Sequence, residues 1–570
     1  MIQPIYLTLD KLLQGRLFEI PDYQRTYSWT KKQRADLFGD IKKLKGYAET
    51  SGRDHFMATV VCLETKTPQT IGADEFQVLK IVDGQQRLTT IIILLKEIFL
   101  ALDSKDKIEN KTRTDLDELL IKRDKRLIIL QINHDSSNIF KNYLREAKDP
   151  PSAEGIKIQA DLNLANAIKE CREFVAQWEN DGLSIIALLR LVKNRLGFVL
   201  YILDDEAPVY TVFEVLNSRG LDVDSLDKCK SMLMGVAFEK CGKAKEHHIR
   251  ELHENWKKIY QFMGKRLVPG YEILRFTATF LSKEKPSETL GEEDSLSLFA
   301  KICDGDPNKV ISISQNLLNV AEKLEELYRD PRREAVTQII HARLLAISIL
   351  LSDSFKVDER VKLLNAWEKI TFRIFGMHGK DARTKRGDFT KLAWDIYNKK
   401  ITAGEALDTL EKIGQEFPID EAVNQLAKQR DCYNGWQEEL RYFFYRYEEF
   451  LVKQEGSSVD KALWEKIWSN TAYSTIEHIF PQQPSGGWSG KMGKGRDTVQ
   501  NNVNRLGNLL LLSPGKNSEA YNREFKDKKE IYKKIPLRII RDVTKVADWT
   551  KDTIDKRERI FLEWAKQEWK

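Results

Sequence analysis

Two short stretches decide how the C-terminal part of this chain folds: Ile476-Glu477-His478-Ile479-Phe480-Pro481-Gln482, and Arg505-Leu506-Gly507-Asn508-Leu509-Leu510-Leu511-Leu512-Ser513. In the first stretch, Glu477 and His478 interrupt an apolar run. The packing of apolar side chains gives no reason for an acidic residue and a histidine at these positions. Neighbouring residues of a strand point to opposite faces, so we expect these two side chains to meet different surroundings. Cutting a phosphodiester commonly uses a metal beside a base that activates water. The stretch therefore predicts a hydrolytic site.

The second stretch supplies two asparagines to the same site. Asn508 follows Gly507 in a turn before an apolar strand, where its amide can fix the orientation of a histidine through a hydrogen bond. Asn517 lies nine residues further on, at the entry to an expected helical stretch, 518–532, that is rich in Lys and Arg. Strand, loop, strand and helix in this order is the plan of a ββα-metal site.

The positive charge of the chain is concentrated behind the Glu-His motif. Over 570 residues the net charge is only +6, but residues 485–570 carry 20 Lys and Arg against 12 Asp and Glu. Such a local excess favours a polyanionic partner, DNA or RNA. Lys and Arg on solvated helix faces are the alternative that charge alone leaves open.

The remaining composition indicates a globular protein of a reducing compartment. Hydrophobic residues make up 42% of the chain, which suffices for packed cores, and the length fits three to four domains. The six cysteines are scattered without a C-x-x-C pair, so neither a disulfide framework nor a structural zinc site is expected. The N-terminus does not resemble a signal peptide, and the apolar runs 91–102 and 196–203 cannot span a bilayer. We expect a cytoplasmic protein without membrane contact.

The first part of the chain reads as mixed α and β. The β-rich runs 56–63 and 76–82 suit a pair of strands, 88–102 suits a buried helix, and 196–203 suits another strand. From about 235 to 470 the pattern is mainly helical. The predicted class is therefore α+β, mostly helical.

A second constellation lies at the strand-to-helix turn 82–90. Free backbone amides and the helix dipole favour an anion there, Arg87 adds a fork suited to phosphate, and Thr89 adds a hydroxyl. The chemistry alone favours a helix cap with a surface arginine. The residues of this turn that would surround a bound anion are Asp83, Gly84, Gln85, Gln86, Arg87 and Thr89.

The C-terminal motifs resemble the DUF1524 branch of the HNH (His-Me finger) nucleases over about residues 440–570. The match rests on Glu477-His478-Ile479-x-Pro481-Gln482, Leu506-Gly507-Asn508-Leu509 and Asn517. The resemblance implies that His478 is the general base and that Asn508 orients it. It also implies that Glu477 and Asn517 help to hold one Mg²⁺-like ion.

The N-terminal motifs resemble DUF262 domains, which are related to the ParB/sulfiredoxin fold. Three segments match in order: 20–29 with Tyr23-Gln24-Arg25, the Asp83-Gly84-Gln85-Gln86-Arg87 turn, and 213–221 with Asn217 and Arg219. The resemblance implies nucleotide binding and hydrolysis by these residues. Structural salt bridges from Arg25, Arg87 and Arg219 to nearby carboxylates stay open as the alternative, because a buried unpaired arginine is costly.

Both domains in one chain resemble the GmrSD-type modification-dependent restriction enzymes. The expected division is a nucleotide-binding domain at 1–235, a helical connecting region at 236–440 and a nuclease domain at 441–570. The resemblance implies a nucleotide-regulated, metal-dependent DNA endonuclease that defends against phage carrying modified DNA. A non-catalytic nucleic-acid sensor and a nuclease toxin acting on host nucleic acid remain alternatives. The resemblance implies a nucleoside triphosphate of unspecified base. The sequence is also compatible with a homo-oligomer.

Overall fold

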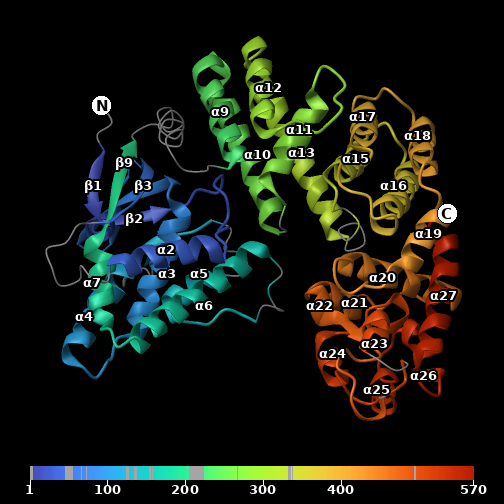
Figure 1. Cartoon of the computed structure of the whole chain (residues 1–570). Helices are drawn as coiled ribbons and strands as arrows, with labels where there is room; N and C mark the ends of the chain where they lie inside the picture. The colour runs from blue at the N-terminus through green and yellow to red at the C-terminus, as the bar shows by residue number, and fades with distance from the viewer. Residues whose placement is uncertain are drawn as a thin grey trace. The chain divides into compact units, whose positions relative to one another are not determined.

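The computed structural model of the chain is mostly helical, with one larger sheet in its first half (Figure 1). It divides into two compact units, residues 1–278 with 291–325, and residues 279–290 with 326–570. The three-domain division expected from the sequence stays a prediction. The described residues are 4–44, 55–65, 67–71, 73–122, 127–133, 138–152, 156, 158–203, 224–265, 268–330, 336, 338–488, 490–492 and 496–570.

The first unit is built on a mixed sheet of described strands in the order β1-β9-β3-β5-β2-β8, with β4 added beside β5. β3 is antiparallel to β5 and parallel to β9, so the expected pairing of the runs 56–63 and 76–82 is confirmed. The strands are β1 (Ile5–Thr8), β2 (Arg16–Glu19), β3 (His55–Glu64), β4 (Gln69–Ile71), β5 (Asp74–Asp83), β8 (Leu130–Gln131) and β9 (Leu196–Leu203), with a separate pair β6 (Ile121–Lys122) and β7 (Leu127–Ile128).

Helix α3 (Gln85–Ala101) is the centre of this unit, and the predicted buried helix is confirmed. Its residues 91–95 are completely shielded from solvent because the helix packs against α6 (Gln159–Asn180). The chain enters α3 through Gly84, whose φ of +92° is costly for any residue with a side chain. A Cβ at Gly84 would also meet the Thr59 carbonyl oxygen at 3.1 Å.

Of the other helices of the first unit, those up to α7 lie around the sheet, and those from α9 onward follow the last strand of the sheet in the sequence (Figure 1). They are α1 (Leu9–Leu13), α2 (Lys31–Lys43), α4 (Lys107–Leu120), α5 (Ile139–Glu146), α7 (Ile185–Arg195), α9 (Ser225–Lys240), η3 (Gly242–Ala244), α10 (Lys245–Lys265), α11 (Gly270–Leu281), α12 (Glu292–Gly305) and α13 (Lys309–Arg329).

The second unit is helical apart from one strand pair, so the mainly helical character predicted for 235–470 is confirmed in the described residues. Its helices before that pair are α15 (Ile340–Leu351), α16 (Val357–Thr371), the π-helical turn η4 (Phe372–Met377), α17 (Arg386–Tyr397), α18 (Ala403–Gln415), α19 (Ile419–Lys428), α20 (Gln437–Gln454), α21 (Lys461–Trp468) and α22 (Ala472–Thr475). After β10 (Ile476–His478) follow η5 (Gly486–Trp488), α23 (Arg496–Val503), η6 (Leu506–Asn508), α24 (Pro514–Ala520), α25 (Phe525–Tyr532), η7 (Arg538–Ile540), α26 (Arg541–Lys545) and α27 (Lys551–Glu568).

Strands β10 (Ile476–His478) and β11 (Leu509–Leu511) pair antiparallel, with His478 opposite Leu509. The two expected strands are present and helix α24 follows β11, but the connection between the strands contains helix α23 as well as η5 and η6. The single helix expected over 518–532 is instead two helices, α24 and α25. The chain breaks between them at Tyr521, whose φ of +25° does not continue a helix.

Helix α27 holds the strand pair from behind. A Cβ at Gly507 would lie 2.3 Å from the Ile554 carbonyl oxygen, so the close approach of α27 requires glycine there. Arg557 donates from Nη1 to the carbonyl oxygens of Gly507 and Leu509 at 2.9 and 2.7 Å. The start of β11 is thereby fixed to the last helix.

Membrane insertion finds no support in the described helices, none of which is both long and apolar enough to cross a bilayer.

Candidate active site

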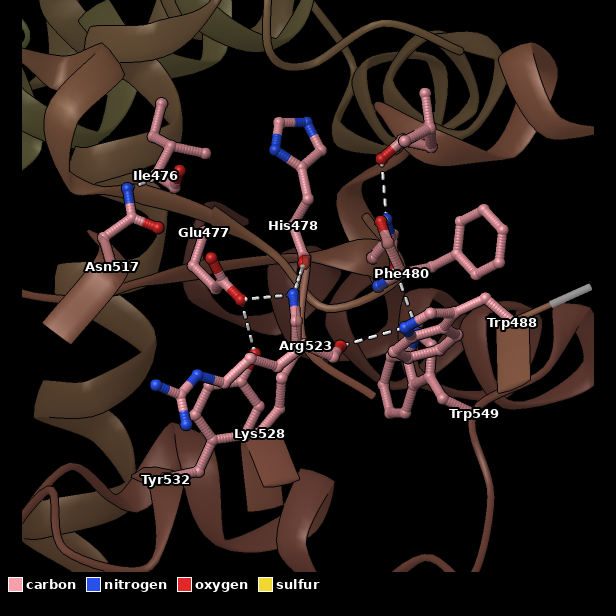
Figure 2. A network of polar contacts seen from close by, with 12 residues as sticks. Ile476, Glu477, His478, Phe480, Trp488, Asn517, Arg523, Lys528, Tyr532 and Trp549 are labelled. Atoms are coloured by element: carbon pink, nitrogen blue, oxygen red, sulfur yellow. Dashed lines mark hydrogen bonds and ion pairs between the residues drawn. The ribbon is translucent and has the colours of Figure 1, made fainter. Parts of the chain in front are cut away.

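Glu477 and His478 leave strand β10 on opposite faces, as predicted. In Figure 2 the imidazole of His478 projects one way and the carboxylate of Glu477 turns toward Lys528 and Tyr532. Both side chains are buried, with 3% of Glu477 and 8% of His478 exposed. The strand thus presents its acid and its base to two separate environments.

The Glu477 carboxylate is already occupied by protein groups. Its Oε1 accepts hydrogen bonds from Lys528 Nζ and from the Tyr532 hydroxyl, each at 2.7 Å. Lys528 also donates to the His478 carbonyl oxygen at 2.6 Å. Burial raises the pKa of Glu477, and the ammonium of Lys528 opposes that rise. In this arrangement the carboxylate is paired with an ammonium, and a role of Glu477 in holding a metal ion stays a prediction. The carboxylate locks β10 to α25.

Asn517 fits the expected ligand role better. Its Nδ2 donates to the carbonyl oxygens of Ser474 and Ile476, at 2.9 and 3.2 Å. This orients the amide and leaves Oδ1 without a hydrogen bond to any residue that the structure describes. A fixed amide oxygen is a suitable ligand for a hard cation. Among the described residues, however, no group of three His, Cys, Asp or Glu side chains could hold a metal ion.

Asn508 is placed differently from our expectation. The side chain is completely buried, and its Oδ1 accepts from Phe480 N at 2.8 Å and from Trp549 Nε1 at 2.9 Å. Its Nδ2 donates to the carbonyl oxygens of Phe480 and Val503. With both ends of the amide used, Asn508 does not bond the imidazole. It shapes the chain that leaves β10, so it supports His478 through the backbone.

The imidazole is held by another asparagine. His478 Nε2 lies 2.9 Å from Oδ1 of Asn504, a residue that the sequence reasoning passed over. Burial lowers the pKa of His478 to about 4, although the Asn504 hydrogen bond opposes that fall. The ring is therefore neutral near pH 7, which is the form that can accept a proton. Nothing in the sequence distinguishes Asn504 from its neighbours Asn501 and Asn502.

The N-terminal group lies where β5 meets α3. The Asp83 carboxylate accepts a hydrogen bond from Gly84 N at 2.8 Å, and burial raises the pKa of Asp83. The Arg87 guanidinium lies 5.7 Å from the centre of the Trp29 ring, a cation–π contact. Burial lowers the pKa of Arg87, with Asp83 opposing. Within the described residues Arg87 has no hydrogen bond and no ion pair, so the salt-bridge alternative finds no support for it there.

The glutamines and the threonine of this turn have unequal roles. Gln86 accepts from Ser28 N at 2.8 Å and donates to the Thr26 carbonyl oxygen at 2.9 Å, so it anchors the segment after Arg25. Thr89 is 1% exposed and donates its hydroxyl to the Gln85 carbonyl oxygen, so it does not supply the expected donor to a ligand. Gln85 is different, because its Oε1 is buried and has no hydrogen-bond partner in the part of the chain that the structure describes.

The segment with Tyr23, Gln24 and Arg25 reaches the same region. Arg25 Nη1 lies 3.7 Å from the Asp227 carboxylate, a loose pair that matches the salt-bridge alternative. The Tyr23 ring stacks on His253 with centroids 4.0 Å apart, so one of its faces is already covered. Gln24 is buried, and its backbone amide donates to the Pro21 carbonyl oxygen.

Helices α9 and α10 add residues that the sequence reasoning did not assign to this group. Lys230 donates to the Tyr23 carbonyl oxygen at 2.9 Å, and burial lowers the pKa of Lys230 to about 7. Tyr260 donates its hydroxyl to Asp227. The available signal was that Lys230 lies one helical turn from Asp227, the carboxylate nearest Arg25. Asn217 and Arg219, also expected here, lie outside the described residues.

Comparison with known families gives two matches that fall on the two groups. The family model of the GmrSD restriction endonuclease N-terminal domain matches residues 8–234, and that of the GmrSD restriction endonuclease C-terminal domain matches residues 417–564. Together the matches span well over half of the chain, and each contains one of the candidate sites. No curated protein gave a match to the sequence.

Proposed function

Because the chain belongs to the GmrSD restriction endonuclease family, we propose how its two groups divide the work of cutting DNA. In this proposal, hydrolysis takes place at His478 in an HNH-type site, and a nucleoside triphosphate bound at the β5–α3 turn controls it. The target is foreign DNA, above all phage DNA with modified bases.

The observation that carries the proposal is the buried, neutral imidazole of His478. Asn504 holds its Nε2, and Nδ1 accepts no hydrogen bond from a described residue. A base with a free lone pair and a fixed ring suits removal of a proton from water. The excess of basic residues after position 485 supports attraction of the DNA backbone to this part of the chain.

The proposed reaction is hydrolysis of one phosphodiester. Nδ1 of His478 takes a proton from water while the water oxygen forms a bond to phosphorus, and the bond from phosphorus to the leaving sugar oxygen breaks. The proton then passes to that leaving oxygen through solvent. A divalent ion, Mg²⁺ by expectation, would be held by Oδ1 of Asn517. When bound, such an ion stabilises charge that develops on the phosphate and the leaving oxygen.

The proposed nucleotide site rests on polar groups that form no hydrogen bond within the described residues. Arg87 has no hydrogen bond or ion pair there, although the carboxylates of Asp83 and Asp40 favour its charge, and the backbone amides at the start of α3 favour phosphate. The partnerless Oε1 of Gln85 is a buried acceptor that a ligand donor could satisfy. NTP hydrolysis in this group is part of the proposal.

The test is cleavage by the purified full-length chain of a panel of modified and unmodified phage DNAs. Each nucleoside triphosphate is added in turn, with Mg²⁺ or with EDTA, and His478→Ala is the control for contaminating nuclease. We expect cleavage of modified DNA that depends on one nucleotide. If no nucleotide changes the rate of cleavage, the proposal that a nucleotide controls the nuclease is refuted.

The same assay separates the alternatives. A non-catalytic sensor would bind DNA without nicking it under any of these conditions. A toxin would instead cut unmodified host nucleic acid and arrest growth on expression without phage.

A further inference from the structure

The loop that precedes α20, residues 431–436, reaches the imidazole of His478 from a part of the chain far from both motifs. We propose that Asp431 and Asn504 are positioning residues that keep the proton of His478 on Nε2, so that Nδ1 is the base. The inference rests on the proposed function, in which His478 accepts a proton from water. It assigns a role to two residues that neither motif contains.

The contact between Asn504 and His478 fixes the tautomer if the amide oxygen faces the ring. Oδ1 of Asn504 lies 2.9 Å from Nε2 of His478. An amide oxygen accepts hydrogen bonds and cannot donate them. In a neutral imidazole, Nε2 must then carry the proton, and Nδ1 must carry the lone pair.

Asp431 decides which end of the Asn504 amide faces the ring. Asp431 precedes Cys432, whose backbone amide bonds the Asn504 carbonyl oxygen, and its carboxylate interacts with the Asn504 side chain. Burial pushes the pKa of Asp431 up, but hydrogen bonds from Asn434, Tyr433 and Asn504 outweigh it and lower the pKa. An ionised carboxylate only accepts, so Nδ2 of Asn504 must face Asp431. Its oxygen is left for the imidazole.

Asp431 is itself held by its own loop. Its Oδ1 accepts from the backbone amides of Tyr433 and Asn434 at 3.1 and 2.9 Å, and its Oδ2 accepts from Asn434 Nδ2 at 2.9 Å. Cys432 N donates to the Asn504 carbonyl oxygen at 2.8 Å. The loop therefore fixes both the backbone and the side chain of Asn504.

The same loop limits rotation of the imidazole by packing. The Tyr433 ring meets the His478 ring edge-on, with centroids 4.5 Å apart, and Tyr473 supports Tyr433 from 5.2 Å. A ring held at one nitrogen and along one edge has a single orientation. Figure 2 shows the imidazole standing clear of the Glu477, Lys528 and Tyr532 cluster on the other face of β10.

The direct test reads the tautomer by NMR of protein labelled with ¹⁵N-histidine, without DNA and with no metal added. The His478 signals are assigned by their loss in His478→Ala. We expect the Nε2–H tautomer in the wild type and a mixture of tautomers in Asn504→Leu. The double swap Asp431→Asn with Asn504→Asp keeps an acceptor on Nε2 and an amide donor between the two positions, so it should restore the Nε2–H form. Asn470→Leu, which does not contact the ring, is the matched control.

Cleavage kinetics give the second readout. Asn504→Leu should lower kcat on the order of 100-fold with the KM for DNA unchanged, and the double swap should recover most of it. A wild-type tautomer in Asn504→Leu, or no recovery in the double swap, would overturn the positioning role. If the wild type fails to cut DNA, the proposed function fails, while the NMR result still decides the tautomer.

Discussion

The two candidate sites differ in how the protein bonds the side chains that the sequence predicted to be functional. Around β10, Glu477 is paired with Lys528 and Tyr532, and all four hydrogen-bonding positions of Asn508 are used. At the β5–α3 turn, within the described residues, Oε1 of Gln85 is buried without a hydrogen-bond partner and Arg87 forms no hydrogen bond or ion pair.

The difference indicates what each site awaits. Buried polar groups are normally satisfied, and an exception asks for a reason. In the strand-pair site, Glu477 and Asn508 are bonded by other protein groups. Two atoms are left without a bond to a described residue, Nδ1 of His478 and Oδ1 of Asn517. At the β5–α3 turn, a bound ligand would supply the missing hydrogen-bond partners of Arg87 and of Gln85 Oε1.

The largest effect is expected from removing the proposed base of the strand-pair site, His478. His478→Ala should lower DNA cleavage about 10³-fold, because general-base catalysis is lost. DNA binding and the melting temperature should stay near wild type, since no ion pair is removed. Plasmid nicking, band shifts and thermal melts measure these three properties. Undiminished nicking would remove His478 from the mechanism.

The next effect tests whether Glu477 is a structural lock. Lys528→Met leaves a buried carboxylate unpaired, and we expect a loss of about 3 kcal/mol in the free energy of unfolding. The double variant Glu477→Gln with Lys528→Met should recover much of it, because Gln can still bond Tyr532. Urea unfolding measures both. A Lys528→Met variant that is fully stable and binds Mg²⁺ more tightly would restore the metal-ligand role of Glu477.

The third prediction concerns the proposed nucleotide site at the β5–α3 turn. Arg87→Ala should weaken nucleotide binding about 10- to 100-fold, since a charged hydrogen bond is lost, while apo stability changes little. Arg505→Ala is the matched opposite, because Arg505 is paired with Glu558 and Asp555 and its removal should destabilise the fold. Isothermal titration and thermal melts separate the two. Asp83→Ala should likewise lose turnover. Unchanged nucleotide affinity in Arg87→Ala would require another assignment of the turn.

The smallest effect is a pH dependence at the turn site. Burial lowers the pKa of His253 to about 4, whereas an unfolded histidine titrates near 6.5. Between these values the unfolded chain binds a proton that the folded chain does not, so stability falls as pH falls. From pH 6.5 to 5 the His253 contribution is about 1–2 kcal/mol. His253→Phe, which keeps the stacking on Tyr23, should show a shallower loss in unfolding titrations. Equal slopes for the two proteins would contradict the burial of a neutral ring.

The sequence allowed the prediction of features that depend on neighbouring residues. Alternation placed Glu477 and His478 on opposite faces, apolar runs located β3, β5 and β9, and glycine marked the turns at Gly84 and Gly507. It could not pair groups that meet only in the folded chain. Lys528 reaches Glu477 from 51 residues away, and Asn504 reaches His478 from 26. A run with four asparagines, residues 501–508, does not say which one points at the ring.

The hold of α27 on the strand pair has a consequence for the life of the protein. Gly507 and Leu509 are bonded by Arg557, which the ribosome adds some fifty residues later. Until that helix emerges, the start of β11 lacks these two bonds and Gly507 lacks the helix that packs against it. We expect a chain that is truncated before α27 to carry every motif residue and still cut DNA poorly, because the frame of the strand pair is incomplete.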